Sequence, residues 1–237
     1  MKYSLLIVLV LAAAIPVRTQ KVIEKHFDLS SSGFVSMNFQ ISDSIRIITW
    51  KKNEVYVKST INVNDNKNND DYKETFSGSA SSVDITGKLV THCNTYHSRR
   101  KSSDSGRRSA DRGSDSDCCC NCGCETYITH EIYIPENTDF SVETINGNIV
   151  IAGNTAEIRA HTISGYIDLT MSAEKAVALR MRTISGTLYS NFDLGADDKR
   201  GGKRYGGGTV DAHLNGSGGK AIDLETISGD IFFRKGS

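Results

Sequence analysis

The sequence predicts an all-β protein built as a β-solenoid, from a repeated tetrad, an alternating apolar pattern and a composition rich in glycine but poor in proline. The tetrad reads Thr-Ile-Asn-Gly once and Thr-Ile-Ser-Gly three times, and its glycines are 18, 21 and 43 residues apart. A period near 20 residues indicates one small unit stacked on copies of itself. Four nearly identical tetrads favour this interpretation over an ordinary antiparallel meander. The glycines that close the tetrads are Gly147, Gly165, Gly186 and Gly229.

Apolar residues occupy every second position on both sides of the tetrads. Ile158 and Ala160 precede the second copy, and Ile167, Leu169 and Met171 follow it. This period of two indicates strands rather than helices. Each repeat is therefore expected to be a strand, a corner and a second strand. Glycine would supply a positive φ at the corner, where a residue with a Cβ is strained.

Stacked repeats place equivalent residues above one another, roughly 4.8 Å apart. The tetrad isoleucines are then expected to form one ladder and the tetrad threonines another. We expect these isoleucines to be buried, each contributing roughly 2 kcal/mol of transfer free energy.

The N-terminus has the pattern of an export signal. Lys2 is followed by the apolar run Leu5–Ala14, which is shorter than the roughly 20 residues needed to span a bilayer. We predict a signal peptide over residues 1–19, cleaved between Ala14 and Thr19. The mature protein is expected in the periplasm, on the outer cell surface or in the medium, with no membrane span.

The rest of the chain, 20–237, is predicted to form one domain. Irregular early coils are expected over 20–135 and regular repeats over 136–237, with a separate N-terminal sandwich as the alternative. Polar insertions at 93–124 and 195–208 are expected to project from the corners as loops. Early strands are expected at Phe34–Phe39, Ser44–Trp50, Glu54–Val63, Val83–Thr91 and Thr126–Pro135, the last two as a pair.

Three segments carry a family resemblance. They are Ile-Tyr-Ile-Pro at Ile132–Pro135, Val-Glu-Thr-Ile-Asn-Gly-Asn-Ile at Val142–Ile149, and Leu-Glu-Thr-Ile-Ser-Gly-Asp-Ile at Leu224–Ile231. With these segments the chain resembles the bacterial putative-adhesin family, exported domains of unknown function that are common in Bacteroidetes. The resemblance implies a right-handed parallel β-solenoid at the cell surface or envelope. It brings no catalytic residues and no ligand, and the cysteine-rich insertion departs from the family's pattern.

Cysteines crowd one short stretch of the chain. In an exported protein they favour disulfides, which could clamp the base of the loop. Thiolates that bind zinc or copper(I) are the first alternative, and mixed or intermolecular thiols are the second. The cysteines are Cys93, Cys118, Cys119, Cys120, Cys122 and Cys124.

The formal net charge is zero, and no aromatic residues interleave the basic run near Arg99, so specific nucleic-acid binding is not expected. No hydrolase or metalloprotease motif is present. We therefore expect a noncatalytic scaffold or adhesin-like module without a cofactor, binding a glycan or an envelope protein. A thiol-rich metal-binding protein is one alternative. The other is a polysaccharide-active enzyme that uses carboxylates beside the repeats, at Glu143, Asp168, Glu225 and Asp230.

Overall fold

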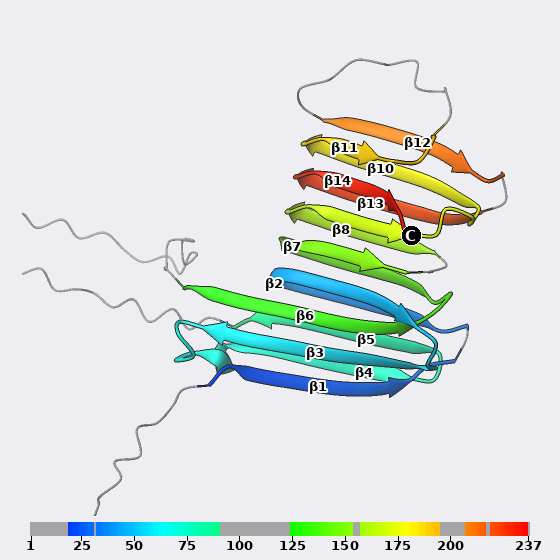
Figure 1. The fold of residues 1–237 in the computed structure, drawn as a ribbon. Helices are drawn as coiled ribbons and strands as arrows, with labels where there is room; N and C mark the ends of the chain where they lie inside the picture. The colour runs from blue at the N-terminus through cyan, green and yellow to red at the C-terminus, as the bar shows by residue number, and fades with distance from the viewer. Residues whose placement is uncertain are drawn as a thin grey trace, which may run out of the picture.

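The computed structural model describes residues 19–30, 32–90, 124–153, 157–194, 207–216 and 219–236. These residues form one fourteen-stranded sheet and a short 3-10 turn at Asn69–Asp71. The all-β prediction is confirmed, and Figure 1 shows the strands stacked from β1 at one end to β12 at the other. The strands are β1 (Lys21–Asp28), β2 (Phe34–Trp50), β3 (Glu54–Val63), β4 (Tyr72–Ser79), β5 (Ser82–Leu89), β6 (Thr126–Pro135), β7 (Asp139–Ala152), β8 (Ile158–Ser164), β9 (Ile167–Met171), β10 (Val177–Ser185), β11 (Leu188–Ser190), β12 (Gly208–Leu214), β13 (Lys220–Ser228) and β14 (Ile231–Lys235).

The long strands β2 and β7 belong to both halves of the sheet. The first part of β2 pairs with β5 and its last part with β6, while both parts pair with β7 across a register shift between Ile41 and Ser44. One half of the sheet, the β6 half-sheet, runs in the order β1-β3-β6-β2-β7-β9-β14-β11. The other, the β8 half-sheet, runs β4-β5-β2-β7-β8-β13-β10-β12.

The two half-sheets enclose one large hydrophobic cluster, and a smaller one of Ile61, Val63, Tyr72 and Ile128 lies near β3, β4 and β6. Val35 and Met37 from the first part of β2 lie in the same buried cluster as Ile45 and Ile47 from its second part. Successive side chains of a strand point to opposite faces, so strands such as β3, β7 and β10 bury every second residue over most of their length. The predicted alternation of buried and exposed positions is confirmed in the repeats, where Ile158, Ala160, Ile167 and Leu169 are buried.

The four repeats are stacked in an order that differs from the sequence. Thr144 lies opposite Thr162, Thr162 lies opposite Thr226, and Thr226 lies opposite Thr183. The last copy in the chain, β13 and β14, is therefore third in space. It fills the level between β8–β9 and β10–β11, as Figure 1 shows.

The predicted parallel architecture is corrected in part, because the sheet is mixed and its strand pairs are parallel only in the central part. The pairs β1–β3, β3–β6, β4–β5 and β10–β12 are antiparallel, and they lie toward the two ends of the stack. Strands β1 to β6 are hydrogen-bonded into the same sheet as the repeats. The expected pairing of Val83–Thr91 with Thr126–Pro135 is wrong, because β5 and β6 flank different parts of β2.

The tetrad isoleucines are exposed, which corrects the expectation that they are buried. Ile145 is 50% exposed and Ile184 is 55% exposed, whereas Thr162 and Thr226 are fully buried. Adjacent residues of a strand point to opposite faces, so an inward threonine forces its isoleucine outward. The buried hydroxyl is satisfied, because Thr162 Oγ1 donates to the carbonyl of Gly147 at 3.1 Å.

The repeated glycines allow the corners to stack closely. The expected positive φ is found at Gly165 (+143°) and Gly229 (+155°), whereas Gly147 and Gly186 do not have a positive φ. A Cβ on Gly147 would meet the carbonyl of Ser42, and a Cβ on Gly186 would meet the carbonyl of Gly229. Close approach of neighbouring backbones is therefore a reason for glycine at the repeat corners, in addition to φ.

Some predictions fall outside the described residues. They are the signal peptide over residues 1–18, most of both insertions, and the cysteines Cys93, Cys118, Cys119, Cys120 and Cys122.

Candidate binding surface

Four aromatic rings gather on the outer face of the β6 half-sheet. The ring centroids of His26 and Tyr56 are 4.7 Å apart, those of Trp50 and Tyr133 are 5.1 Å apart, and those of Tyr56 and Tyr133 are 5.9 Å apart. We call these residues the Trp50 cluster. Their contacts make one continuous aromatic surface of the kind that supports binding in protein interfaces.

Strand register brings the Trp50 cluster together. His26 on β1 lies opposite Tyr56 on β3, which lies opposite Tyr133 on β6, and Trp50 ends the neighbouring strand β2. The indole Nε1 of Trp50 donates to the carbonyl of Glu54 at 2.8 Å. The ammonium of Lys52 lies 4.4 Å from the centroid of the Trp50 ring. The indole is thus held in one orientation before any partner binds.

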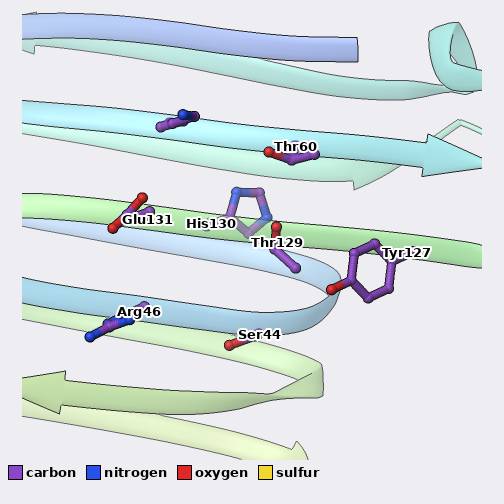
Figure 2. A pocket seen from close by; sticks show the side chains of 8 residues that line it. Ser44, Arg46, Thr60, Tyr127, Thr129, His130 and Glu131 are labelled. Atoms are coloured by element: carbon purple, nitrogen blue, oxygen red, sulfur yellow. The ribbon is translucent and has the colours of Figure 1, made fainter. Parts of the chain in front are cut away.

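A shallow hollow of about 320 Å³ adjoins this cluster (Figure 2). The hydroxyl-bearing side chains of Ser44, Thr60 and Thr129 come from three neighbouring strands and line it. Arg46, Lys58, Tyr127, Glu131 and the otherwise buried His130 complete the lining. The hollow therefore offers hydrogen-bonding groups beside an aromatic surface.

The charges around the cluster are largely compensated within the surface. Lys58 lies 3.9 Å from Glu24, and Glu54 lies 3.4 Å from His26 and 3.3 Å from Lys52. The phenol of Tyr133 donates to Glu131 at 2.9 Å, and this hydrogen bond is the main reason why its pKa is raised. Desolvation, with a contribution from nearby Glu24, raises the pKa of Tyr56. Both phenols are therefore neutral hydrogen-bonding groups at physiological pH.

A second aromatic group lies on the same outer face, farther along the stack. The rings of Tyr189 and Phe232 stack at 5.0 Å, and Tyr166 meets Phe232 edge to face at 6.2 Å. We call these three residues the Phe232 cluster. The guanidinium of Arg234 lies 4.8 Å from the Phe232 centroid and 3.2 Å from a carboxylate oxygen of Asp168. Burial raises the pKa of Asp168, and Arg234 opposes that shift.

The outer face of the β8 half-sheet is different in character. One of its cross-strand rows contains Glu143, His161, Glu225 and Arg182, and Arg182 pairs with Glu225 at 3.3 Å. Both aromatic clusters lie on the other half-sheet. The two outer faces are therefore chemically unequal, and the β6 half-sheet is the stronger candidate for binding.

The four carboxylates named from the sequence do not form one stripe. Glu143 and Glu225 lie on the β8 half-sheet with His161 between them, whereas Asp168 lies on the β6 half-sheet. Asp230 is at a corner, where its Oδ1 accepts the backbone N–H of Thr187 at 2.8 Å. A glycosidase needs two carboxylates on either side of one bond, and Asp168 faces away from the other half-sheet's acids.

A buried polar group that the sequence analysis missed lies inside the β6 end of the stack. Ser59 Oγ is 2.9 Å from Glu74 Oε1 and 2.8 Å from His130 Nδ1, and the Tyr72 hydroxyl is 3.3 Å from His130 Nε2. Burial raises the pKa of Glu74 to about 7 and lowers that of His130 to about 3. One arrangement accounts for these three contacts: neutral His130 donates to Ser59, Ser59 donates to Glu74, and Tyr72 donates to His130, while Glu74 Oε2 is buried without a hydrogen-bond partner.

This buried group has the residue types of a hydrolase triad without access for a substrate. The side chains of Glu74 and His130 are fully buried, and the His130 ring stacks on Phe39 at 3.9 Å. Tyr72 is also buried, and a Cβ at Gly87 would collide with its hydroxyl. The arrangement thus joins β3, β4 and β6 across the interior rather than presenting a nucleophile to solvent.

A second hollow, of about 310 Å³, lies at the stacked corners. Its polar groups bond to one another: Asn148 Nδ2 donates to the carbonyl of Asp43 at 3.3 Å, and Asn148 Oδ1 accepts the N–H of Tyr166 at 3.2 Å. Asp43 Oδ2 accepts the N–H of Ile128 at 2.7 Å. These side chains hold the corners together.

Of the cysteines, only Cys124 is described, and it carries a free thiol that is half-buried. Its Sγ lies 3.9 Å from Nδ2 of Asn64. Among the described residues no group of three His, Cys, Asp or Glu side chains could hold a metal ion. The disulfide and metal predictions for the cysteine run stay predictions, because every possible cysteine partner of Cys124 lies outside the described residues.

Sequence reasoning missed both aromatic clusters because they are assembled by register. Trp50 and Tyr56 lie on the consecutive strands β2 and β3, whereas Tyr133 comes from β6, which is distant in the sequence. The sequence signal that could have found these clusters is an aromatic residue on the polar face of an amphipathic strand. An exposed aromatic side chain is unfavourable there unless a partner covers it.

Comparison with known proteins identifies the fold but no family. No family model and none of the curated proteins matches the chain. A crystal structure of a putative cell adhesion protein from Clostridium sporogenes is similar, with a TM-score of 0.53 and 10% identity over 92% of this chain and 100% of that one. A putative adhesin from Bacteroides fragilis has 10% identity over 92% of this chain and 98% of its own, with a TM-score of 0.25. The first likeness shows a shared fold alone, and the second is too distant to support an argument.

Within the described ranges there is no helix of the length and apolar character that crossing a bilayer requires.

Proposed function

We propose that this chain is a noncatalytic, adhesin-like binding module, exported to the cell envelope or surface, that binds its partner through the outer face of the β6 half-sheet. The observation that carries the proposal is the Trp50 cluster, where rings from β1, β2, β3 and β6 form one surface. Tryptophan and tyrosine supply large contact areas at low conformational cost, and they dominate binding energy in many interfaces. The name of the Clostridium sporogenes protein favours adhesion as the kind of binding.

Two features support the noncatalytic part of the proposal. The residues that resemble a hydrolase triad, Ser59, Glu74 and His130, are enclosed between the half-sheets. Of the carboxylates beside the repeats, Asp168 lies on the opposite half-sheet from Glu143 and Glu225. Function is judged from the site rather than from the fold, and the exposed site here is an aromatic platform.

We further infer that the four repeats are coils of a right-handed β-solenoid. The threonine row from Thr144 to Thr183 and the parallel pairing of successive levels support this interpretation. A stack of this kind provides a flat face that is extended and stiff, which suits attachment to a polymer or a surface.

A binding assay tests the proposal. The purified mature chain is added to intact producing cells and to their isolated envelopes, and the amount retained is measured. Wild type is compared with a Trp50→Ala, Tyr133→Ala double variant. The matched control is Phe34→Ala, which removes an exposed aromatic residue from the β8 half-sheet. We expect the double variant to lose at least about tenfold in retention and the control to bind normally. Equal retention of all three folded proteins would refute the binding surface.

Location is tested separately with a membrane-impermeant amine reagent on intact cells. Lys25 and Lys52 are exposed and report accessibility. Adhesion requires that they react before the envelope is opened. Reaction only after an outer membrane is opened would refute the adhesive role.

A further inference from the structure

We infer that the partner is a neutral, β-1,4-linked polysaccharide that lies across the strands of the β6 half-sheet and stacks on both aromatic clusters. This inference rests on the proposed function and adds the chemical class and orientation of the ligand. It depends on how the two clusters are placed on one face, what lies between them and how the charges there are arranged.

The two clusters are separated by a short series of neighbouring strands. Tyr133 is on β6 and Phe232 is on β14, and β2, β7 and β9 lie between them in consecutive pairs. With a strand spacing of about 4.8 Å, Tyr133 and Phe232 are roughly 19 Å apart across the sheet, and Trp50 on β2 is one strand nearer to Phe232. A sugar unit with its glycosidic bond is about as long as one strand spacing, so a chain laid across the strands would need about five units to reach both clusters.

The face between the clusters carries two cross-strand rows of side chains, one of Ile48, Ala152, Thr170 and Arg234 and one of Arg46, Val150, Asp168 and Phe232. The side chains of Ile48, Ala152, Thr170 and Val150 are half-buried and carry no aromatic or long charged group. The path between the clusters thus combines small apolar side chains with Arg46, Asp168 and Arg234, whose polar groups can bond to the hydroxyl groups of an extended ligand.

Charge complementarity favours a neutral ligand. Lys58 pairs with Glu24, Lys52 and His26 pair with Glu54, and Arg234 pairs with Asp168. A polyanion would have to compete with these carboxylates for the cations, and a polycation would have to compete for the carboxylates. A neutral ligand leaves the pairs intact and still finds donors and acceptors along both sides of its path.

A β-1,4-linked chain of pyranose units matches this mixture of groups. With its substituents equatorial, each ring has two faces of C–H bonds that can pack against an aromatic ring, and a rim of hydroxyl groups. The rings of Trp50 and Tyr189 would receive the C–H faces, while Arg46 and Glu131, which line the adjoining hollow, would bond to hydroxyl groups. Such a polymer also engages both clusters with one molecule.

Trp50 provides a direct readout because it is the only tryptophan of the chain. The probes are cello-oligosaccharides and chito-oligosaccharides from the disaccharide to the hexasaccharide, titrated against the mature chain while Trp50 emission is recorded. We expect the hexasaccharide of at least one series to change the emission. We also expect it to bind at least about tenfold more tightly than the trisaccharide, because two linked contacts reinforce each other.

The variant Tyr189→Ala separates the two clusters. Tyr189 is 47% exposed, so its removal is not expected to disturb the core, and a thermal melt verifies that the variant is folded. Hexasaccharide affinity should fall to that of the trisaccharide, whereas trisaccharide binding should be unchanged. Equal affinity for short and long chains, unaffected by Tyr189→Ala, would overturn the two-cluster inference but leave the proposed function standing.

Two further outcomes keep the inference distinct from the proposed function. If no oligosaccharide binds while retention on cells still depends on Trp50 and Tyr133, the polysaccharide inference is wrong and the binding surface serves another partner. If retention is also independent of these residues, both the inference and the proposed function are wrong.

Discussion

The hydroxyl of Thr226 donates a hydrogen bond to the carbonyl oxygen of Gly165, 3.1 Å away, although the residues are 61 positions apart in the chain. The same bond joins Thr162 to Gly147 over 15 positions and Thr183 to Gly229 over 46. Each repeat is thus tied to its spatial neighbour by one identical contact. The threonine and glycine of the tetrad serve one purpose, which is to fasten stacked corners.

Replacing Thr226 by valine tests this contact. The change keeps the side-chain volume but leaves the carbonyl of Gly165 without its donor, so the free energy of unfolding should fall by about 1–2 kcal/mol. Thr170→Val is the control, because Thr170 is on the outer face of β9 rather than in the core. Chemical denaturation gives the free energy of unfolding of both variants. Similar decreases in the two variants would show that the buried hydroxyl of Thr226 has no special role.

Replacing Gly186 by alanine tests the stacked corners. A Cβ at Gly186 would collide with the backbone of Gly229, whereas a Cβ at Gly208 would make only an ordinary contact with Leu188 at 3.5 Å. We expect Gly186→Ala to destabilise the fold by about 1–3 kcal/mol through overpacking, and Gly208→Ala to change it little. Thermal melting measures both. An unchanged melting temperature for Gly186→Ala would contradict the close stacking that supports the solenoid.

Removing the last strand pair tests the order of the stack. A chain that ends at Gly219 lacks β13 and β14, which lie between β8–β9 and β10–β11. Because an internal level is lost, amide protection by hydrogen exchange should disappear over β10 and β11.

Removal of β1 is the matched truncation, since β1 pairs only with β3 at the end of the β6 half-sheet. Protection of β10 and β11 should survive that change. Retained protection in the chain that ends at Gly219 would show that β10–β11 can stack directly on β8–β9.

The buried carboxyl of Glu74 predicts an unusual dependence of stability on pH. Burial raises its pKa to about 7, so its stabilising contribution is complete below about 4.5 and is lost as the pH rises to about 7. Burial lowers the pKa of His130 from 6.5 to about 3, so its contribution is lost as the pH falls through that range. Between about 4.5 and 6.5 the two trends oppose each other.

Glu74→Gln removes one of these trends. At about pH 8 the variant should be more stable than wild type by roughly 1–3 kcal/mol, because it no longer has to ionise a buried carboxyl, and the advantage should vanish near pH 4. Glu143→Gln, at an exposed position of the β8 half-sheet, is the control. Denaturation curves across this pH range measure the difference in unfolding free energy between Glu74→Gln and wild type. A difference that does not change with pH would refute the role of Glu74.

The sequence by itself determined the all-β class, the position of the corners and the residues that stack on one another. The tetrads and the alternation of apolar and polar residues are local properties of the sequence. They define the two faces of a strand whichever strand lies beside it. The sequence also contained the information that Thr162 or Ile163 must point inward, but not which of them does. Hydrophobicity favoured the isoleucine, while the hydrogen bond from Thr162 to Gly147 makes threonine the inward residue.

Only the tertiary structure decided which strands are neighbours. β13 and β14 enter the stack between earlier repeats, and β5 and β6 flank different parts of β2. Nearly identical repeats offer nearly identical partners, so their local pattern cannot fix the order of the levels. Both clusters depend on which strands are neighbours, because Tyr133 joins residues of β1 to β3 from the distant strand β6, and Phe232 of β14 joins Tyr189 of β11 and Tyr166. For this reason the candidate binding surface emerged from strand register and not from any motif.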